Sequence, residues 1–432
     1  MTRANQKEDE PEEKSAWKTL YKGALRFLMM IRDANINYSR NEGTSLPGFM
    51  PEPDLFGVNF GKDAPGAGFA LFGSQADIRR RAARNGWLST DSLMTTPYHK
   101  QFTESVTAQV SVEPFTDFRI TVNFGYNKVE NKSSYYTYNS ILDDFAETNP
   151  VVNGSYNVTN VMIGTAFSKF DKKYFDKTYQ KFLDNRIVIA ERLAQDNAAP
   201  GYDPHVYRYD TAARRNYPQG YMSNNQDVMI PALIAAYTGC DPYKVSLSAM
   251  DKFPLPNWSL TYSGLTKIKG VRKVFKNFSI SHAYSSSYTV GSYTNNLLYK
   301  DAQDFVENID EAGNFRSRYI MDGIVLSEQF SPLIKINMTF INDLSLNFEY
   351  RQSRQIGLSF VNNQITESRT KEWIVGAGYR IKNVGFKVNS GGAGKRRISS
   401  DIVLRADFSI RDNIRLLRKI DQQINTPSEG AV

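Results

Sequence analysis

The chain has 432 residues, of which 41% are hydrophobic and 13% aromatic, and its formal net charge is +8. This composition is too apolar and too aromatic for a disordered chain. The single cysteine, Cys240, excludes an internal disulfide framework and a cysteine-based zinc or iron–sulfur site, and the three histidines leave little for an imidazole metal site. We therefore expect no metal, no cofactor and no enzymatic activity.

The chain begins with charged and polar residues. Residues 1–16 contain Glu, Asp and Lys but no hydrophobic core, which predicts a disordered lead without a secretory signal. Either the protein stays inside the cell or Met1 is not its natural start. No run of about 18 apolar residues is present anywhere in the sequence, so no membrane-spanning helix is predicted.

Residues 17–168 show the alternation of apolar and polar side chains that is typical of β-strands. It is clearest in Phe102–Val112 and Phe118–Tyr126, which flank a short connection and predict a hairpin. Two polar stretches, 41–100 and 131–155, are expected to be long loops between strands.

Residues 169–254 depart from this pattern because their apolar spacing becomes helical, first from Phe175 to Leu193 and again in the run Val228–Tyr237. We expect a partly helical insert that forms a cap or docks a partner. Counted from the short turns, the strand entering the insert and the strand leaving it at Trp258 run in the same direction. A closed meander does not allow this, so either one crossing is unassigned or the insert itself crosses the wall.

Strands return over residues 255–412, and residues 413–432 are expected to be a truncated tail. The alternation is clearest in Phe330–Phe340, Leu344–Tyr350, Trp373–Ile381 and Ile402–Ile410. Short turns alternate with long polar stretches such as 291–323, an asymmetry typical of outer-membrane barrels. The predicted fold is all-β dominated: part of a very large antiparallel transmembrane β-barrel with long outer loops and one partly helical insert.

Alternation assigns the strand side chains to two faces. An apolar row is expected to face lipid, and it includes Val110, Val122, Ile336, Phe348, Leu404 and Phe408. The opposite row is expected to line a wet lumen as a polar wall, and it includes Glu349, Arg351, Arg380, Arg405, Asp407 and Arg411. In a soluble sandwich, the same polar row would be the solvent side. Two basic amphipathic stretches, 17–32 and 265–277, either lie at the headgroup surface or are solvated connectors.

Other conspicuous residues are interpreted as structural. His282 interrupts the apolar row and is expected to be a neutral residue at an interface or under a partner. The glycine run 391–395 lacks the first glycine and the final serine or threonine of a phosphate loop, so a flexible turn is expected. Asp143-Asp144 and Cys240 are expected to lie in loops. Basic residues are scattered, without the helix-borne stripe expected for nucleic-acid binding.

Six segments spread over nearly the whole chain carry a resemblance to a known family. They are Arg26–Phe49 (RFLMMIRDANINYSRNEGTSLPGF), Asp227–Gly239 (DVMIPALIAAYTG), Leu255–Gly264 (LPNWSLTYSG), Ser279–Tyr293 (SISHAYSSSYTVGSY), Ser327–Leu333 (SEQFSPL) and Leu404–Asp421 (LRADFSIRDNIRLLRKID). These segments resemble the SprA (Sov) family of gliding-motility and secretion proteins, the outer-membrane translocons of the type IX secretion system. The resemblance implies a very large barrel in the cell outer membrane that passes folded cargo proteins with C-terminal sorting signals.

The resemblance also implies partners. These are the remaining segments of the same barrel, a partner outer-membrane barrel, a plug protein, periplasmic components of the secretion system, the secreted cargo and membrane lipid. Family members continue beyond the segment that matches Asp421, so a fragment from the C-terminal region is expected. Two alternatives stay open: a soluble or surface-anchored β-rich binding protein that uses the tyrosines of Tyr135–Tyr138, and a self-contained small outer-membrane pore or receptor.

Overall fold

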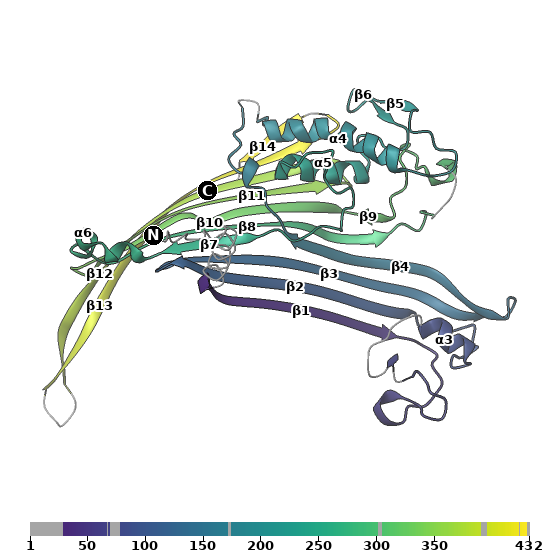
Figure 1. Cartoon of the computed structure of the whole chain (residues 1–432), viewed down its shortest axis with the longest axis horizontal. Helices are drawn as coiled ribbons and strands as arrows, with labels where there is room; N and C mark the ends of the chain where they lie inside the picture. Colours follow the sequence, from purple (N-terminus) through teal and green to yellow (C-terminus); the bar gives the residue numbers. More distant parts are fainter. Residues whose placement is uncertain are drawn as a thin grey trace, which may run out of the picture.

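One large antiparallel sheet contains most of the chain (Figure 1). The computed structural model describes residues 29–66, 68–69, 78–171, 174–300, 305–389, 395–422 and 424–429. The sheet has 12 strands, and its main path follows the order β1-β2-β3-β4-β8-β10-β11-β12-β13-β14. This confirms the prediction of a β-dominated fold built on an antiparallel sheet. In the described residues, β1 and β14 lie at opposite edges and do not pair with each other.

Many strands are longer than expected. The strands of the sheet are β1 (Ile31–Ser45), β2 (Tyr98–Phe115), β3 (Phe118–Asn139), β4 (Asp144–Thr159), β7 (Asn257–Tyr262), β8 (Phe275–Asn295), β9 (Tyr319–Met321), β10 (Gly323–Phe340), β11 (Leu344–Ser359), β12 (Gln364–Asn389), β13 (Lys395–Lys419) and β14 (Ile424–Glu429). With 26 residues, β12 far exceeds the roughly 10 residues that a tilted strand needs to cross a bilayer.

Two segments that the sequence did not assign to strands belong to the sheet. The stretch 131–155, expected to be a long loop, is the end of the β3–β4 hairpin. The expected tail after residue 412 is the end of β13 together with β14. One face of each segment is covered by other parts of the chain, because Tyr136 packs against the core around α3 (Ile78–Arg84) and Arg418 is buried beside Asp176 of the insert. Polar and charged residues take part in these covered faces, so the alternation is lost from the sequence while the hydrogen-bonded ladder continues.

Helices occupy a small part of the described chain. They are α3 (Ile78–Arg84), α4 (Lys177–Asp196), α5 (Gln226–Thr238) and α6 (Lys269–Arg272), with 3₁₀ turns at Leu55–Gly57, Ile163–Thr165, Gly264–Lys267 and Phe305–Asn308 and a small hairpin, β5 (Tyr207–Asp210) and β6 (Arg215–Pro218). Among the described residues, no helix has the length and apolar character needed to cross a membrane.

β4 and β7 share a single position in the sheet. β3 pairs with β4 over Tyr126–Asn139 and with β7 over Phe118–Asn123. On the other side, β8 pairs with β7 over Ile280–Tyr284 and with β4 over Ser287–Thr294. Both strands are antiparallel to β3 and so run in the same direction. They are two halves of one strand that breaks at Thr159 and resumes at Asn257.

This broken strand explains the direction conflict found in the sequence, and neither predicted explanation applies. The insert leaves the sheet halfway along a strand and returns to the same place, so it covers residues 160–256 rather than 169–254. The break is closed by the hydrogen bond from Leu255 N to Thr159 O, 2.9 Å. The side chain of Asn257 replaces missing ladder bonds by accepting from Ser286 N and donating to Ser286 O, at 2.9 and 3.2 Å.

The main core lies between the two long helices of the insert and one face of the sheet. α5 is apolar on all sides and is buried along almost its whole length. Below it lie Tyr288, Leu326 and Ile356 from β8, β10 and β11. Figure 1 shows α4 and α5 beside β11 and β14, whereas the short α6 lies at the opposite end of the sheet, near the extended ends of β12 and β13. A smaller core surrounds α3 and includes Trp87 and Tyr98.

Candidate functional site

The register places the two predicted rows on opposite faces of the sheet. Ile336 pairs with Phe348, and Phe348 pairs with Val375. Val375 in turn pairs with Phe408, so one apolar row crosses β10 to β13. This surface, the apolar face, carries all six residues of the predicted apolar row: Val110, Val122, Ile336, Phe348, Leu404 and Phe408. The six residues of the predicted polar wall lie on the opposite surface, the charged face.

Half of the apolar face is bare. Phe408 is 65% exposed and Leu404 57% exposed, and Trp373 and Val375 beside them are also exposed. We call this area, around Phe348, Trp373, Val375, Leu404 and Phe408, the bare band. The apolar row of β13 from Ile402 to Ile410 extends about 27 Å along the strand. Membrane barrels carry an apolar band of about 25 Å.

The charged face carries a ladder of ion pairs across four strands. Glu349 lies 3.1 Å from Lys335 and also pairs with Arg351. Arg351 reaches Glu372 at 3.6 Å, and Arg411 reaches the same carboxylate at 2.7 Å. Separately, Arg405 and Asp407 pair at 2.8 Å along β13. The sequence placed these charges on one face but gave no sign that most of them neutralise one another.

The structure also brings Arg380 and Arg405 together at a cleft of about 530 Å³. Lys276 and Lys335 contribute two further positive charges to this cleft, against the single carboxylate of Asp343 in the turn before β11. Lys335 pairs with Glu349, Arg405 with Asp407 and Lys276 with Asp343, so most of the positive charge around this cleft is also neutralised.

The helical insert lies on the apolar face, beside the bare band. β11 pairs with β12 without a register break, so its even-numbered residues from Leu344 to Leu358 share one face. Phe348 belongs to the bare band, whereas Ile356 and Leu358 are buried beneath the insert. The insert therefore does not lie on the face predicted to line a lumen.

Buried ion pairs fasten the insert to the sheet. Arg354 of β11 pairs with Glu328 of β10 at 2.9 Å, and both side chains are almost fully buried. The same guanidinium donates to the backbone oxygen of Thr165 in the insert at 2.8 Å. A charged pair in such a place is costly to break because removing one partner leaves a buried charge without compensation.

A second buried cluster contains two carboxylates and two guanidinium groups. Arg369 lies 2.7 Å from Asp176 and 2.6 Å from Glu367, and Arg418 lies 3.1 Å from Glu367. Asp176 also begins α4, because its other carboxylate oxygen accepts from Tyr179 N at 2.6 Å. The cluster has no net charge and joins the first turn of α4 to β12 and β13.

Sequence reasoning missed these clusters, although a signal was present. Arg354, Glu367 and Arg418 occupy positions of the apolar row in their strands. A charge in an otherwise apolar row is costly in lipid, so these residues mark where the bare band ends and the covered half of the face begins.

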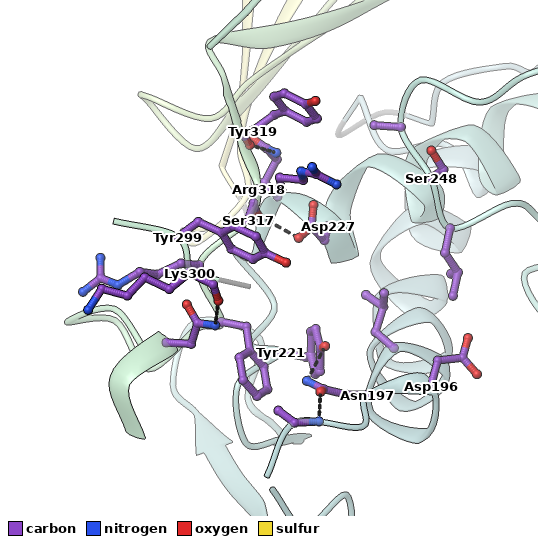
Figure 2. A pocket seen from close by; sticks show the side chains of 18 of the residues that line it. Asp196, Asn197, Tyr221, Asp227, Ser248, Tyr299, Lys300, Ser317, Arg318 and Tyr319 are labelled. Atoms are coloured by element: carbon purple, nitrogen blue, oxygen red, sulfur yellow. Dashed lines mark hydrogen bonds between the residues drawn. The ribbon is translucent and has the colours of Figure 1, made fainter. Parts of the chain in front are cut away.

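The insert contains a pocket of about 760 Å³ between the end of α4, the start of α5 and the segment 315–321 (Figure 2). Asp227 accepts a hydrogen bond from Ser317 Oγ at 2.7 Å, and Asn197 donates to the Tyr221 hydroxyl at 2.9 Å. Burial raises the pKa of the Asp227 carboxyl and that of the Tyr221 phenol. The volume of this pocket is within the range of small-molecule sites. No sequence motif predicted the pocket, because its walls come from segments that are far apart in the sequence.

His282 has two hydrogen-bond partners. Trp258 Nε1 donates to His282 Nε2 at 3.3 Å, and His282 Nδ1 lies 2.7 Å from Leu333 O. The indole can only donate and the carbonyl can only accept, so in this geometry Nε2 acts as the acceptor and Nδ1 as the donor. Within the described ranges, no group of three or more His, Cys, Asp or Glu is placed to hold a metal ion.

The remaining expected features are unremarkable or fall outside the described residues. Cys240 is exposed and free, and Asp143 lies in the turn between β3 and β4. The glycine run 391–394 and residues 17–28 of the first basic stretch are not among the described residues. Comparison with protein-family models and with curated proteins found no match to this chain.

Proposed function

We propose that this chain forms part of the wall of a transmembrane β-barrel in the outer membrane and acts as a segment of a protein-conducting translocon. The observation that carries the proposal is the bare band, which lies directly behind the ion-pair ladder of the charged face on the same strands. A soluble protein rarely leaves so large an apolar surface in water. In a membrane wall, the bare band would contact lipid and the charged face would contact water.

The two sheet edges support the proposal that further strands complete the wall. Almost every residue of β1 is exposed, and β14 pairs only with Ile414–Lys419 of β13. The edge of β13 beside the bare band therefore has free backbone groups in the described part of the chain. In lipid each unpaired backbone group costs several kcal/mol, so these edges require neighbouring strands. We propose the remaining segments of the same barrel as those neighbours.

The distribution of connections supports an orientation. The connections near the bare band include the short turn 341–343 and the segment 263–274. The longest connections, which are the loop 46–97, the insert and the segment 296–318, lie at or toward the other end, together with the short turns 140–143 and 360–363. Outer-membrane barrels keep short turns on the periplasmic side and long loops outside. We therefore place the insert on the outer surface of the wall, beyond the bilayer, where a partner barrel, a plug protein or cargo would meet it.

The narrower assignment to an SprA-type translocon rests on the resemblance of the six segments. A polar wall performs no covalent chemistry, and selectivity in such a channel depends on width, gating and partners. Passage of folded cargo with C-terminal sorting signals, and contact with periplasmic components, belong to this proposal.

A matched pair of substitutions tests the membrane wall. Phe408→Arg places a charge in the bare band and should cost about 2–4 kcal/mol of insertion free energy near the bilayer midplane. Ser409→Arg places the same charge on the charged face at the same depth and should cost almost nothing. The readout is the fraction of full-length protein assembled in the outer membrane. Equal assembly of both variants, or wild-type protein that remains soluble without lipid, would favour the soluble binding protein instead.

A further inference from the structure

The buried arginine of α4, Arg186, differs from two buried arginines of the sheet. Arg186 of α4 is 4% exposed, as deeply buried as Arg354 and Arg418. Both of those arginines pair with a carboxylate, Glu328 and Glu367 respectively. In the described part of the chain Arg186 has no carboxylate within ion-pair distance. Its hydrogen bond runs from Nη1 to Ser223 O at 3.2 Å, and its Nε has no partner.

The acids near Arg186 are engaged elsewhere. Asp184 on the same helix pairs with Arg215 at 2.9 Å. Asp210 accepts from the backbone amides of Ala212, Ala213 and Ser223. The ring of Phe182 lies 5.5 Å from the Arg186 guanidinium and compensates the charge only in part. A buried cation without an anionic partner is costly. A negatively charged group bound next to Arg186 would therefore be stabilised.

A cleft of about 210 Å³ opens beside this guanidinium, between α4 and the β5–β6 hairpin. Its polar lining comes from Gln180, Arg186, Arg215 and Tyr217, and its apolar lining from Phe175, Leu183 and Ala213. The Tyr217 side chain is fully buried and its hydroxyl has no partner. Burial raises the pKa of that hydroxyl, so it stays protonated and available as a donor.

We propose that this cleft binds a carboxylate group with a short apolar body. The guanidinium edge with the free Nε and the Tyr217 hydroxyl would donate to its two oxygens, because arginine presents donors that match a planar carboxylate. Arg215 is already neutralised by Asp184, so the cleft holds one uncompensated positive charge. A singly charged carboxylate matches this charge better than a doubly charged phosphate. The site lies within the insert and does not depend on the proposed membrane role.

The test uses the full chain in lipid nanodiscs with propionate as the probe and neutral propionamide as its isostere. Binding slows hydrogen exchange through the linkage factor 1 + [L]/Kd, so a propionate concentration ten times Kd should slow exchange of α4 amides about 11-fold. Propionamide should leave the exchange rate unchanged. Equal protection by both compounds, or protection by phosphate as strong as that by propionate, would overturn the assignment.

Variants locate the effect. Arg186→Met should abolish the effect of propionate on hydrogen exchange. Without propionate, the α4 amides of this variant should exchange no faster than in wild type, because the substitution removes an uncompensated buried charge. Tyr217→Phe, which keeps the ring, should weaken propionate binding about tenfold or more and remains informative if Arg186→Met does not fold. Arg208→Gln removes an exposed cation from β5 and should respond like wild type. A full propionate response in Tyr217→Phe and Arg186→Met would refute the site.

Discussion

Asp176 combines two functions whose contributions can be separated by substitution. It caps α4 through Tyr179 N and contributes one negative charge to the buried cluster with Arg369 and Arg418. Asp176→Ala removes both, which predicts about 1 kcal/mol for the cap and about 3–5 kcal/mol for the broken buried pair. Asp176→Asn keeps an oxygen for the cap and removes only the charge, which predicts about 3–5 kcal/mol.

Hydrogen exchange of the α4 amides measures these losses directly, because local opening of the insert exposes those amides. A loss of about 4–6 kcal/mol in Asp176→Ala corresponds to exchange roughly 10³–10⁴-fold faster than in wild type. Asp184→Asn is the matched control, since it breaks the exposed pair with Arg215 on the same helix and should cost about 1 kcal/mol or less. If Asp176→Asn and Asp184→Asn exchange alike, the buried cluster does not fasten the insert.

Three further predictions follow from the same geometry. Glu328→Gln should destabilise the attachment of the insert by about 3–5 kcal/mol in a proteolysis or exchange assay, because it leaves Arg354 buried without its carboxylate, and an unchanged rate would show that the pair does not support the insert. In the turn outside the bare band, Lys276 and Lys382 lower the pKa of Asp343 to about 2. The pKa of Asp343 in the folded protein lies below the ordinary value, so the stabilisation is present above about pH 4 and disappears as the pH falls through about 2. The difference in melting temperature between wild type and Asp343→Asn should therefore vanish near pH 2. A difference that stays constant with pH would contradict the pairing. This chain alone should give no stable conductance in planar bilayers, because the two edges of the described sheet do not pair with each other, and steady single-channel currents would favour the self-contained small pore.

Alternation predicted the sheet and its two faces because one row of each strand meets an apolar environment and the other meets water. The row containing Phe348 and Phe408 could be recognised for this reason. The same signal fails in the β3–β4 hairpin beyond Asn131, where a polar residue, Ser134, is buried against the segment around α3. There the backbone ladder maintains the strands, and backbone hydrogen bonds leave no mark on the sequence.

The broken strand could not be predicted from local patterns. β7 has six residues and pairs with segments far away in the chain, so only the register of β3 and β8 shows that it continues β4. The position of the insert on the sheet could have been predicted more easily from the sequence. The apolar row is interrupted by three charged residues, Arg354, Glu367 and Arg418. Because such charges are costly in lipid, they predict that protein rather than lipid covers that half of the face.

Spin labels along one strand give the most direct test of the membrane wall. In a Cys240→Ser background, single cysteines at positions 402 to 411 of β13 would carry labels in lipid nanodiscs, with oxygen as the lipid-soluble quencher and a nickel chelate as the water-soluble one. We predict that even positions such as Phe408 are accessible to oxygen and odd positions such as Asp407 to the nickel chelate, with a period of two. Nickel accessibility at both sets of positions would contradict the membrane wall.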